Sequence, residues 1–160
     1  MLNTGDAFPS LTVTPVDGDP VALPAAVAGR YAVVLLYRGG WCPYCNAQLR
    51  AFERAAERFA EDDIAVIALS VDDAETTKGT VAEHGLTFPV GYGADAEAVA
   101  AATGAFVNDD PRFLQSTGFV LGPDGRVLVA VYSTGAIGRL LPDDVRGMVR
   151  YARSQAEATA

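Results

Sequence analysis

The chain has 160 residues, half of them hydrophobic and a fifth charged, which is typical of one globular domain with its own core. Its formal net charge of −8 disfavours nucleic acid and anionic membranes as partners, because both are themselves negatively charged. The first residues lack the basic segment and apolar core of a signal peptide, and no apolar run approaches the ~18 residues of a membrane span. We therefore expect a single domain over residues 1–160, located in the cytoplasm.

The first half of the chain predicts a hairpin followed by a strand–helix–strand unit. Residues 11–23 alternate weakly around a turn, and their prolines suit the edge of a sheet. Residues 31–37 are apolar throughout, as in a parallel strand that is buried on both faces. Residues 46–60 carry an apolar stripe at helical spacing, and residues 64–71 resemble the first apolar strand in composition. The crossover between the two strands should be right-handed.

The second half predicts three more helices and a second hairpin. The expected elements are a helix over 74–83, a short strand over 87–90, a helix over 95–103, a loop over 108–112, strands over 118–121 and 126–132, and a helix over 141–153 with a frayed end over 154–160. We expect Asp72 to be a turn or cap residue and His84 to cap the negative end of its helix before Gly85. Together the elements predict an α/β fold: a mixed central sheet with helices on both faces and an N-terminal hairpin extension.

Both cysteines and the only tryptophan lie in one stretch between the apolar strand and the first helix, Arg38-Gly39-Gly40-Trp41-Cys42-Pro43-Tyr44-Cys45. Pro43 suits the first helical position, so Cys42 falls at or near the N-cap and faces unpaired backbone N–H groups. The positive helix end favours the thiolate, and in such motifs the cysteine pKa falls to roughly 3.5–7.5. Cys45 lies one turn further on the same face, close enough to form a disulfide.

Three interpretations of this cysteine pair are open. The cysteines can be buried and inert, as in many proteins. They can form half of a zinc site, but zinc needs four ligands and the one histidine, His84, is distant in sequence, so a second chain would have to complete it. They can be a redox pair, since C-x-x-C beside a strand–helix–strand unit is the recognised signature. A disulfide in so short a loop would add only ~2 kcal/mol, which favours the redox interpretation without metal or cofactor.

Further segments surround the cysteine motif in an order that resembles a known family. These segments are residues 5–9, 16–23, 69–72, 84–89 and 118–125. With Trp41-Cys42-Pro43-Tyr44-Cys45, they resemble the AhpC/TSA (peroxiredoxin-like) branch of the thioredoxin superfamily over nearly the whole chain. The resemblance implies a thioredoxin-like fold, an antioxidant oxidoreductase that works with a thiol, and a homodimer.

The chain departs from the family pattern at the site itself. The family motif Pro-x-x-x-Thr/Ser-x-x-Cys places Arg38 at the proline, Cys42 at the hydroxyl residue and Cys45 at the attacking cysteine. The family's second arginine falls near Ser116, and Arg112 is close enough in sequence to replace it. The resemblance thus names Cys45 as the attacking residue, whereas exposure and helix-end electrostatics favour Cys42. The order of attack stays open.

Two enzymatic functions follow. A thiol peroxidase would form a sulfenic acid with hydrogen peroxide or an organic hydroperoxide, and the second cysteine would convert it to a disulfide. A thioredoxin- or glutaredoxin-like protein would then reduce the disulfide, and Arg38 would stabilise the thiolate and the leaving oxygen. A thioredoxin-like oxidoreductase would instead attack protein or small-molecule disulfides, with Trp41 on the docking surface. The overall resemblance favours the peroxidase.

A redox-sensitive binding module without turnover is a third class. It requires a partner that binds only one oxidation state of Cys42 and Cys45. We expect Trp41 and Tyr44 to shape and shield the site rather than to react, and Pro43 to support it from the first helical position.

Overall fold

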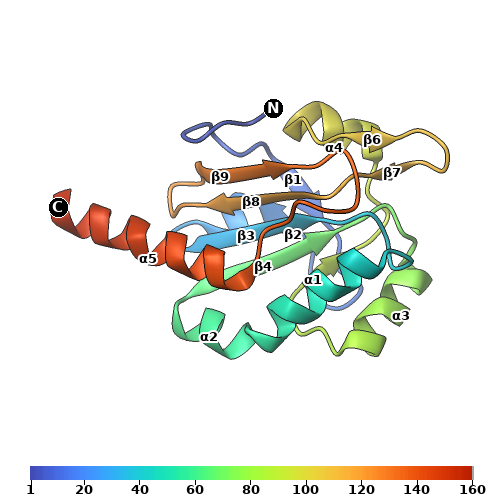
Figure 1. Cartoon of the computed structure of the whole chain (residues 1–160), viewed down its shortest axis with the longest axis horizontal. Helices are drawn as coiled ribbons and strands as arrows, with labels where there is room; N and C mark the ends of the chain where they lie inside the picture. Colours follow the sequence, from blue (N-terminus) through green and yellow to red (C-terminus); the bar gives the residue numbers. More distant parts are fainter. Residues whose placement is uncertain (160) are drawn as a thin grey trace.

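The computed structural model describes residues 1–159, and its centre is a sheet with strand order β5-β4-β3-β8-β9 (Figure 1). The strands are β3 (Tyr31–Leu36), β4 (Ile64–Leu69), β5 (Val90–Gly91), β8 (Thr117–Leu121) and β9 (Val127–Tyr132). β3 pairs in parallel with β4 and antiparallel with β8, which confirms the mixed sheet. Every residue of β3 is buried, as its unbroken apolar sequence predicted.

Alternate residues of β3 face two separate hydrophobic clusters. Tyr31, Val33 and Leu35 pack in one cluster with α1 (Pro43–Arg54), α2 (Ala56–Glu61) and α5 (Pro142–Thr159). Residues 32, 34 and 36 face the other cluster, which contains α4 (Ala96–Thr103), the 3-10 turn η1 (Ala25–Val27) and the hairpin of β1 (Leu11–Val13) and β2 (Val21–Leu23). Figure 1 shows the first group of helices in front of the sheet, and α3 (Ala74–His84) lies beside α1. The predicted helices on both faces and the N-terminal hairpin are therefore confirmed.

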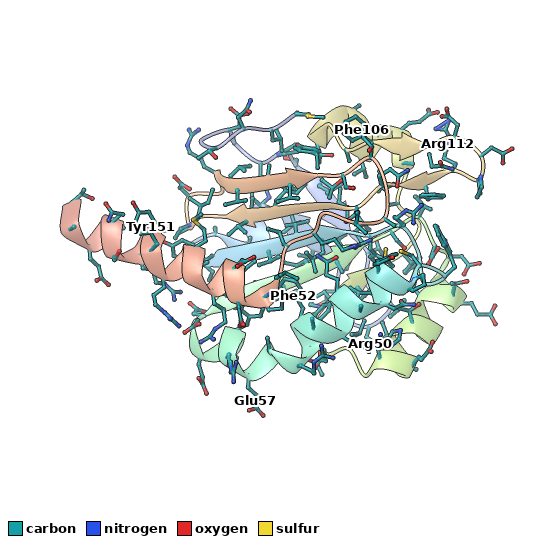
Figure 2. The ribbon with its side chains drawn as sticks, in the orientation of Figure 1. Arg50, Phe52, Glu57, Phe106, Arg112 and Tyr151 are labelled. Atoms are coloured by element: carbon teal, nitrogen blue, oxygen red, sulfur yellow. The ribbon has the colours of Figure 1, made fainter. Side chains whose placement is uncertain are left out.

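The helix that follows the cysteine motif is amphipathic, as predicted, but it is not continuous. It breaks at Ala55 into α1 and α2. Phe52 faces the sheet and stacks on Phe59 with ring centroids 5.4 Å apart, whereas Arg50 and Glu57 point away from the sheet (Figure 2). The predicted apolar stripe is thus the side that meets the core.

Several boundaries differ from the sequence-based expectations. The short strand expected over residues 87–90 is β5, which begins only at Val90. The segment predicted as a loop is the tip of a small hairpin of β6 (Val107–Asn108) and β7 (Phe113–Leu114). The second apolar strand ends at Leu69, two residues early. The last helix was expected to fray from residue 154, yet α5 continues to Thr159, because Ala, Gln and Glu dominate its last turns and favour helix. Its end projects beyond the sheet in Figure 1.

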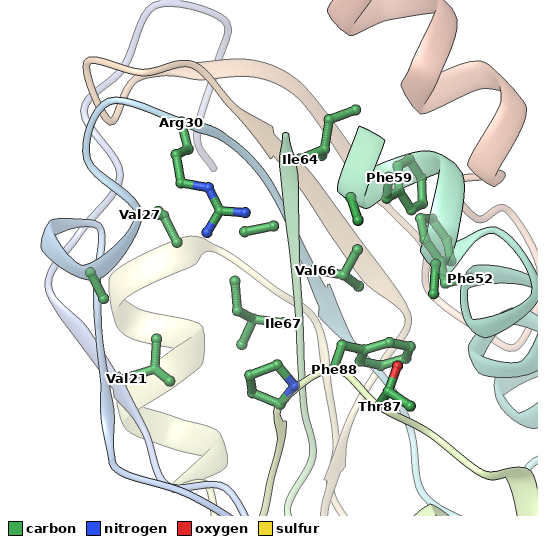
Figure 3. A pocket seen from close by; sticks show the side chains of 15 residues that line it. Val21, Val27, Arg30, Phe52, Phe59, Ile64, Val66, Ile67, Thr87 and Phe88 are labelled. Carbon is green, nitrogen blue, oxygen red and sulfur yellow. The ribbon is translucent and has the colours of Figure 1, made fainter. Parts of the chain in front are cut away.

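A hollow lies along the outer edge of β4 (Figure 3). It has a volume of about 450 Å³, and its walls include Phe52, Phe59 and Phe88. Among residues 1–159, β5 pairs with β4 only at Ala68 and Leu69, so the first part of this edge has no neighbouring strand. The hollow is at the amino end of β4, whereas the cysteine motif follows the carboxyl end of β3, and none of the predicted site residues lines it.

The helices between residues 1 and 159 are all too short or too polar to cross a membrane.

Replacing Gly91 tests how tightly β5 is packed at the edge of the sheet, and replacing Gly79 in α3 is the control. A Cβ atom on Gly91 of β5 would lie 2.5 Å from Val13 Cγ1 and 2.8 Å from Leu69 Cδ1. We expect Gly91→Ala to lower the free energy of unfolding by about 1–3 kcal/mol through overpacking. Gly79→Ala, in α3 with open space around it, should raise the same quantity by up to about 1 kcal/mol. Urea unfolding of both variants checks this, and equal effects would contradict the packing described for β5.

Candidate active site

The cysteine motif forms the turn between β3 and α1. Cys42 is the N-cap of α1, and its sulfur accepts a hydrogen bond from the Cys45 N–H at 3.3 Å. Pro43 is the first helical residue, so the predicted placement of both is confirmed. Both cysteines are free thiols, and both are fully buried. The expectation that Cys42 is exposed is therefore wrong, because two arginine side chains lie next to the sulfurs.

Arg139, from the loop between β9 and α5, makes the shortest of these contacts. Its Nη2 donates to Cys45 Sγ at 2.9 Å and lies 3.8 Å from Cys42 Sγ. The guanidinium is held in turn by Gln48 of α1, whose Oε1 accepts from Nη1 at 2.8 Å, and by the Ala136 carbonyl, which accepts from Nε at 2.8 Å. Gln48 is itself buried and donates to the Leu140 carbonyl, so α1 fixes this loop at two points.

Arg38 is the other arginine beside the sulfurs, and it lies next to Cys42. Its Nη1 lies 3.8 Å from Cys42 Sγ, and its Nε donates to Gln115 Oε1 at 3.0 Å. The guanidinium carbon is 4.9 Å from the centre of the Trp41 ring and 5.0 Å from that of Phe113, close enough for cation–π attraction to both. The predicted role of Arg38 beside the thiols is consistent with this placement.

Arg139, the second arginine of the site, was not among the site residues predicted from the sequence. Ser116 is buried, and its backbone carbonyl accepts a hydrogen bond from the Ser133 N–H. Arg112 does not replace it, because it forms an exposed ion pair with Glu97 at 3.0 Å beside the β6–β7 hairpin (Figure 2). A topological signal did exist. The strand before the last helix runs parallel to β3 and ends at the same edge of the sheet, and Arg139 is the only Lys or Arg between that strand and the helix.

The two sulfurs differ in their affinity for a proton. Burial opposes the ionisation of Cys42, yet hydrogen bonds from the Cys45 thiol and N–H, with the Arg38 guanidinium and the charge of Arg139, lower the pKa of Cys42. Burial raises the pKa of Cys45, and the hydrogen bond that its thiol donates to Cys42 raises it further. The hydrogen bond from the Arg38 backbone N–H and the charge of Arg139 lower this pKa, but they do not outweigh burial. Although Arg139 is nearer to Cys45, the negative charge is therefore favoured on Cys42.

The backbone N–H and carbonyl of Gly40 are both hydrogen-bonded, which fixes the turn. Its N–H donates to Asp72 Oδ2 at 2.8 Å, and its carbonyl accepts from Asn46 Nδ2 at 2.9 Å. A Cβ at this position would lie 2.5 Å from Thr80 Oγ1, so the approach requires glycine. Burial raises the pKa of the Asp72 carboxyl, in spite of the Gly40 bond. Asp72 thus holds the turn, and Asp73 beside it is the N-cap of α3.

Trp41 and Tyr44 lie at the rim of the site, 54% and 55% exposed. Trp41 meets Phe113 edge to face, with ring centroids 4.9 Å apart.

His84 is the last residue of α3, before Gly85 in the left-handed conformation, as its predicted capping role requires. Nowhere in residues 1–159 do three or more His, Cys, Asp or Glu side chains group together as metal ligands.

A buried cysteine with a lowered pKa, beside a second thiol and two guanidinium groups at the carboxyl end of the central strand, is typical of a thiol-dependent oxidoreductase. Known proteins agree with this. The sequence pattern of the AhpC/TSA family matches residues 4–130, and the chain belongs to that family. A Mycobacterium tuberculosis protein whose name places it among the peroxiredoxins is 31% identical, with 87% of this chain and 90% of that one covered. A Methanothermobacter thermautotrophicus peroxiredoxin is 27% identical over 98% of this chain and 76% of its own length.

Solved structures of the family share the fold. Enterococcus faecalis AhpC superposes with a TM-score of 0.84 at 15% identity, covering 100% of this chain and 98% of that one. The peroxidoxin BcpB of Mycobacterium tuberculosis superposes with a TM-score of 0.80 at 20% identity, covering 94% and 98%. The predicted thioredoxin-like fold is thereby confirmed. By class, the chain is a thiol-dependent peroxidase, an oxidoreductase.

Replacing Arg139 tests how the thiolate is stabilised. We expect Arg139→Met to raise the pKa of Cys42 and to slow reaction with peroxide by about 10²–10³-fold, the usual loss for one electrostatic donor. Because the wild-type pKa is lowered, the rate should fall with falling pH at a lower pH in the wild type than in the variant. Thiolate absorbance and rate against pH check this. Arg112→Met is the matched control and should change neither, while an unaltered profile in Arg139→Met would contradict the assignment.

Tyr37, next to Arg38, tests the core beneath the site. Among the described residues its hydroxyl has no hydrogen-bond partner of ordinary geometry, and burial raises the pKa of Tyr37 to about 12. An unfolded tyrosine ionises near ~10, so the unfolded state gains charge first and stability is lost as pH rises from that value toward the folded pKa.

We expect the wild type to lose up to about 3 kcal/mol more than Tyr37→Phe over this range. At neutral pH the two should differ by no more than about 1 kcal/mol, since the substitution removes an unpaired hydroxyl. Urea unfolding between pH ~9 and ~12 measures both, with exposed Tyr44→Phe as the control. The same alkaline loss in Tyr37→Phe would show that another group is responsible.

Proposed function

We propose that the chain reduces hydrogen peroxide or organic hydroperoxides through a dithiol–disulfide cycle of Cys42 and Cys45 within one chain, in the cytoplasm. The observation that carries this proposal is the pair of guanidinium groups at the sulfurs, with Arg139 Nη2 at 2.9 Å from Cys45 and Arg38 Nη1 at 3.8 Å from Cys42. A thiolate needs one cation for its own charge. A second cation is useful where a leaving oxygen also becomes negative.

In the first step the Cys42 thiolate attacks one peroxide oxygen. The S–O bond forms as the O–O bond breaks, so Cys42 becomes a sulfenic acid and the leaving oxygen departs as hydroxide or alkoxide. Cys45, whose raised pKa keeps it protonated, gives its proton to that oxygen. Water or an alcohol is released, and Cys45 is left as a thiolate beside the two arginines.

In the second step the Cys45 thiolate attacks the Cys42 sulfenic sulfur. The disulfide forms, and hydroxide leaves and takes a proton from solvent. A thioredoxin- or glutaredoxin-like protein dithiol then restores both thiols by exchange. Pro43 holds Cys42 at the helix start, and the half-exposed Trp41 and Tyr44 supply the rim where the reductant docks.

A thiol–disulfide oxidoreductase is the second candidate. The exposed aromatic rim favours it, since such rings are frequent anchors for protein partners. The buried sulfurs disfavour it, because a protein disulfide must reach the attacking sulfur directly, whereas a peroxide is nearly as small as water. The homodimer that the family resemblance implies stays a prediction.

Stopped-flow fluorescence of Trp41 tests the cycle without a label. With reduced protein we expect a phase whose rate is proportional to peroxide and far above that of free cysteine. Cys42→Ser should abolish it. Cys45→Ser should keep a slower attack and stop at the sulfenic acid, which a sulfenate-specific reagent detects.

The opposite pattern in the two variants would make Cys45 the attacking residue. A wild-type rate no higher than that of free cysteine, with any peroxide, would refute the peroxidase. Disulfide substrates would then be the next test, and rapid exchange with them would support the oxidoreductase.

A further inference from the structure

The part of the β4 edge that lacks a neighbouring strand carries unpaired backbone groups. The Ala68 N–H donates to the Pro89 carbonyl at 3.0 Å, and the Ser70 N–H donates to β5 at 3.4 Å. Even-numbered residues of this segment therefore turn their backbone toward the edge. By the same alternation, the N–H and C=O groups of Ile64 and Val66 face the hollow in Figure 3. Such a row of groups is a template for one more strand.

Apolar side chains form a wall on each side of this edge. Phe52 and Phe59 belong to the cluster on the side of α1 and α2, and Val21 and Val27 belong to the cluster on the opposite face of the sheet. The volume of about 450 Å³ lies within the ~300–1,000 Å³ that ligand pockets usually have. Successive side chains of a strand point to opposite faces. An occupant that pairs with β4 therefore needs apolar side chains on both of its faces.

Arg30 carries the one charge among the described residues of the lining. Its Nε donates to Asp63 Oδ1 at 2.9 Å, but no group within residues 1–159 accepts a hydrogen bond from its two Nη nitrogens. Figure 3 shows the guanidinium turned into the hollow, at the end where β4 begins. This end is suited to a carboxylate, which a guanidinium binds through two parallel N–H groups.

The position of Arg30 selects the direction of the occupant. A peptide that runs antiparallel to β4 ends where β4 begins, so its C-terminal carboxylate would lie at Arg30. A parallel peptide would bring its terminal ammonium group there and would be repelled. The open edge covers residues 64–67, because β5 pairs with β4 from Ala68 onward. Only the last few residues of a bound chain can therefore pair with it.

We propose that the open edge of β4 binds the extended, apolar C-terminal segment of another protein, antiparallel to the strand and with the terminal carboxylate on Arg30. Backbone hydrogen bonds to Ile64 and Val66 would supply affinity, and the two walls would select apolar side chains. This site goes beyond the proposed peroxidase and does not depend on it. Neither Cys42 nor Cys45 lines the hollow, so a bound segment would leave the thiols uncovered.

Fluorescence anisotropy with a labelled peptide measures this binding. The probe is Gly-Ser-Val-Leu-Val-Leu with a free C-terminal carboxylate, and the same peptide with a C-terminal amide is its comparison. We expect saturable binding of the acid with a Kd below about 1 mM. The amide should bind about fivefold more weakly, which is the effect of one partly exposed charge pair.

Two variants at the charged end should act in opposite directions. Arg30→Gln should remove the difference between the acid and the amide. Asp63→Asn should strengthen binding of the acid by about twofold, because Arg30 loses a competing carboxylate. Asparagine also tolerates the positive φ of 52° at this position. Arg50→Gln is the matched control, since Arg50 points away from the sheet and lies outside the lining (Figure 2).

Amide hydrogen exchange locates the bound peptide. In the free protein the Val66 N–H should exchange faster than the Ala68 N–H, which is bonded to the Pro89 carbonyl. The acid peptide should slow exchange at Val66 by about tenfold and leave Ala68 unchanged.

Several outcomes would overturn the inference. They are the absence of saturable binding, equal binding of acid and amide by the wild type, equal weakening by Arg30→Gln and Arg50→Gln, and exchange that slows elsewhere but not at Val66. Binding of decanoate without binding of the peptide would assign the hollow to a small apolar carboxylate instead. Peroxide reduction is measured separately and should be unchanged in all three variants. Its absence in the wild type would refute the proposed function and leave the peptide site standing.

Discussion

A thiolate that is shut off from water must be stabilised by the protein itself, and the rest of the site is arranged around that requirement. Cys42 is fully buried, and burial alone would keep it protonated. Backbone N–H groups at a helix start can lower a thiol pKa, but this is a local effect of the first turn. The charges of Arg38 and Arg139 come from outside the helix, and they favour the ionised form of the buried Cys42 sulfur.

Both arginines are held in place by residues from distant parts of the chain. Arg139 depends on Gln48 of α1, and Arg38 depends on Gln115 and on the rings of Trp41 and Phe113. A long side chain loses conformational freedom when it is fixed, and these contacts offset that cost before any substrate arrives. The site therefore exists only when α1, the β6–β7 region and the loop after β9 are all folded.

The parts of this site that depend on local rules could be predicted from the sequence. Pro43 at the helix start and Cys42 as its N-cap follow from backbone geometry, and the buried β3 follows from its unbroken apolar run. The role of Arg139 could not be predicted from spacing, since it depends on the path of a loop nearly a hundred residues from Cys45. The burial of Cys42 was missed for the same reason, because the side chains that cover it come from that loop and from Arg38.

Placing both cysteines on one helical turn changes what the protein has to do between the two chemical steps. In the proposed cycle the sulfenic acid and the resolving thiol are already neighbours, so no segment has to unfold to bring them together. The same closeness couples their protons. In that cycle we propose that Cys45 holds its proton while Cys42 is the thiolate and releases it when an oxygen leaves, and that this release creates the second nucleophile. The proposed mechanism thus links the order of attack to the order of proton transfer through the interaction of the Cys45 thiol with Cys42, and the arginines would stabilise negative charge on either sulfur.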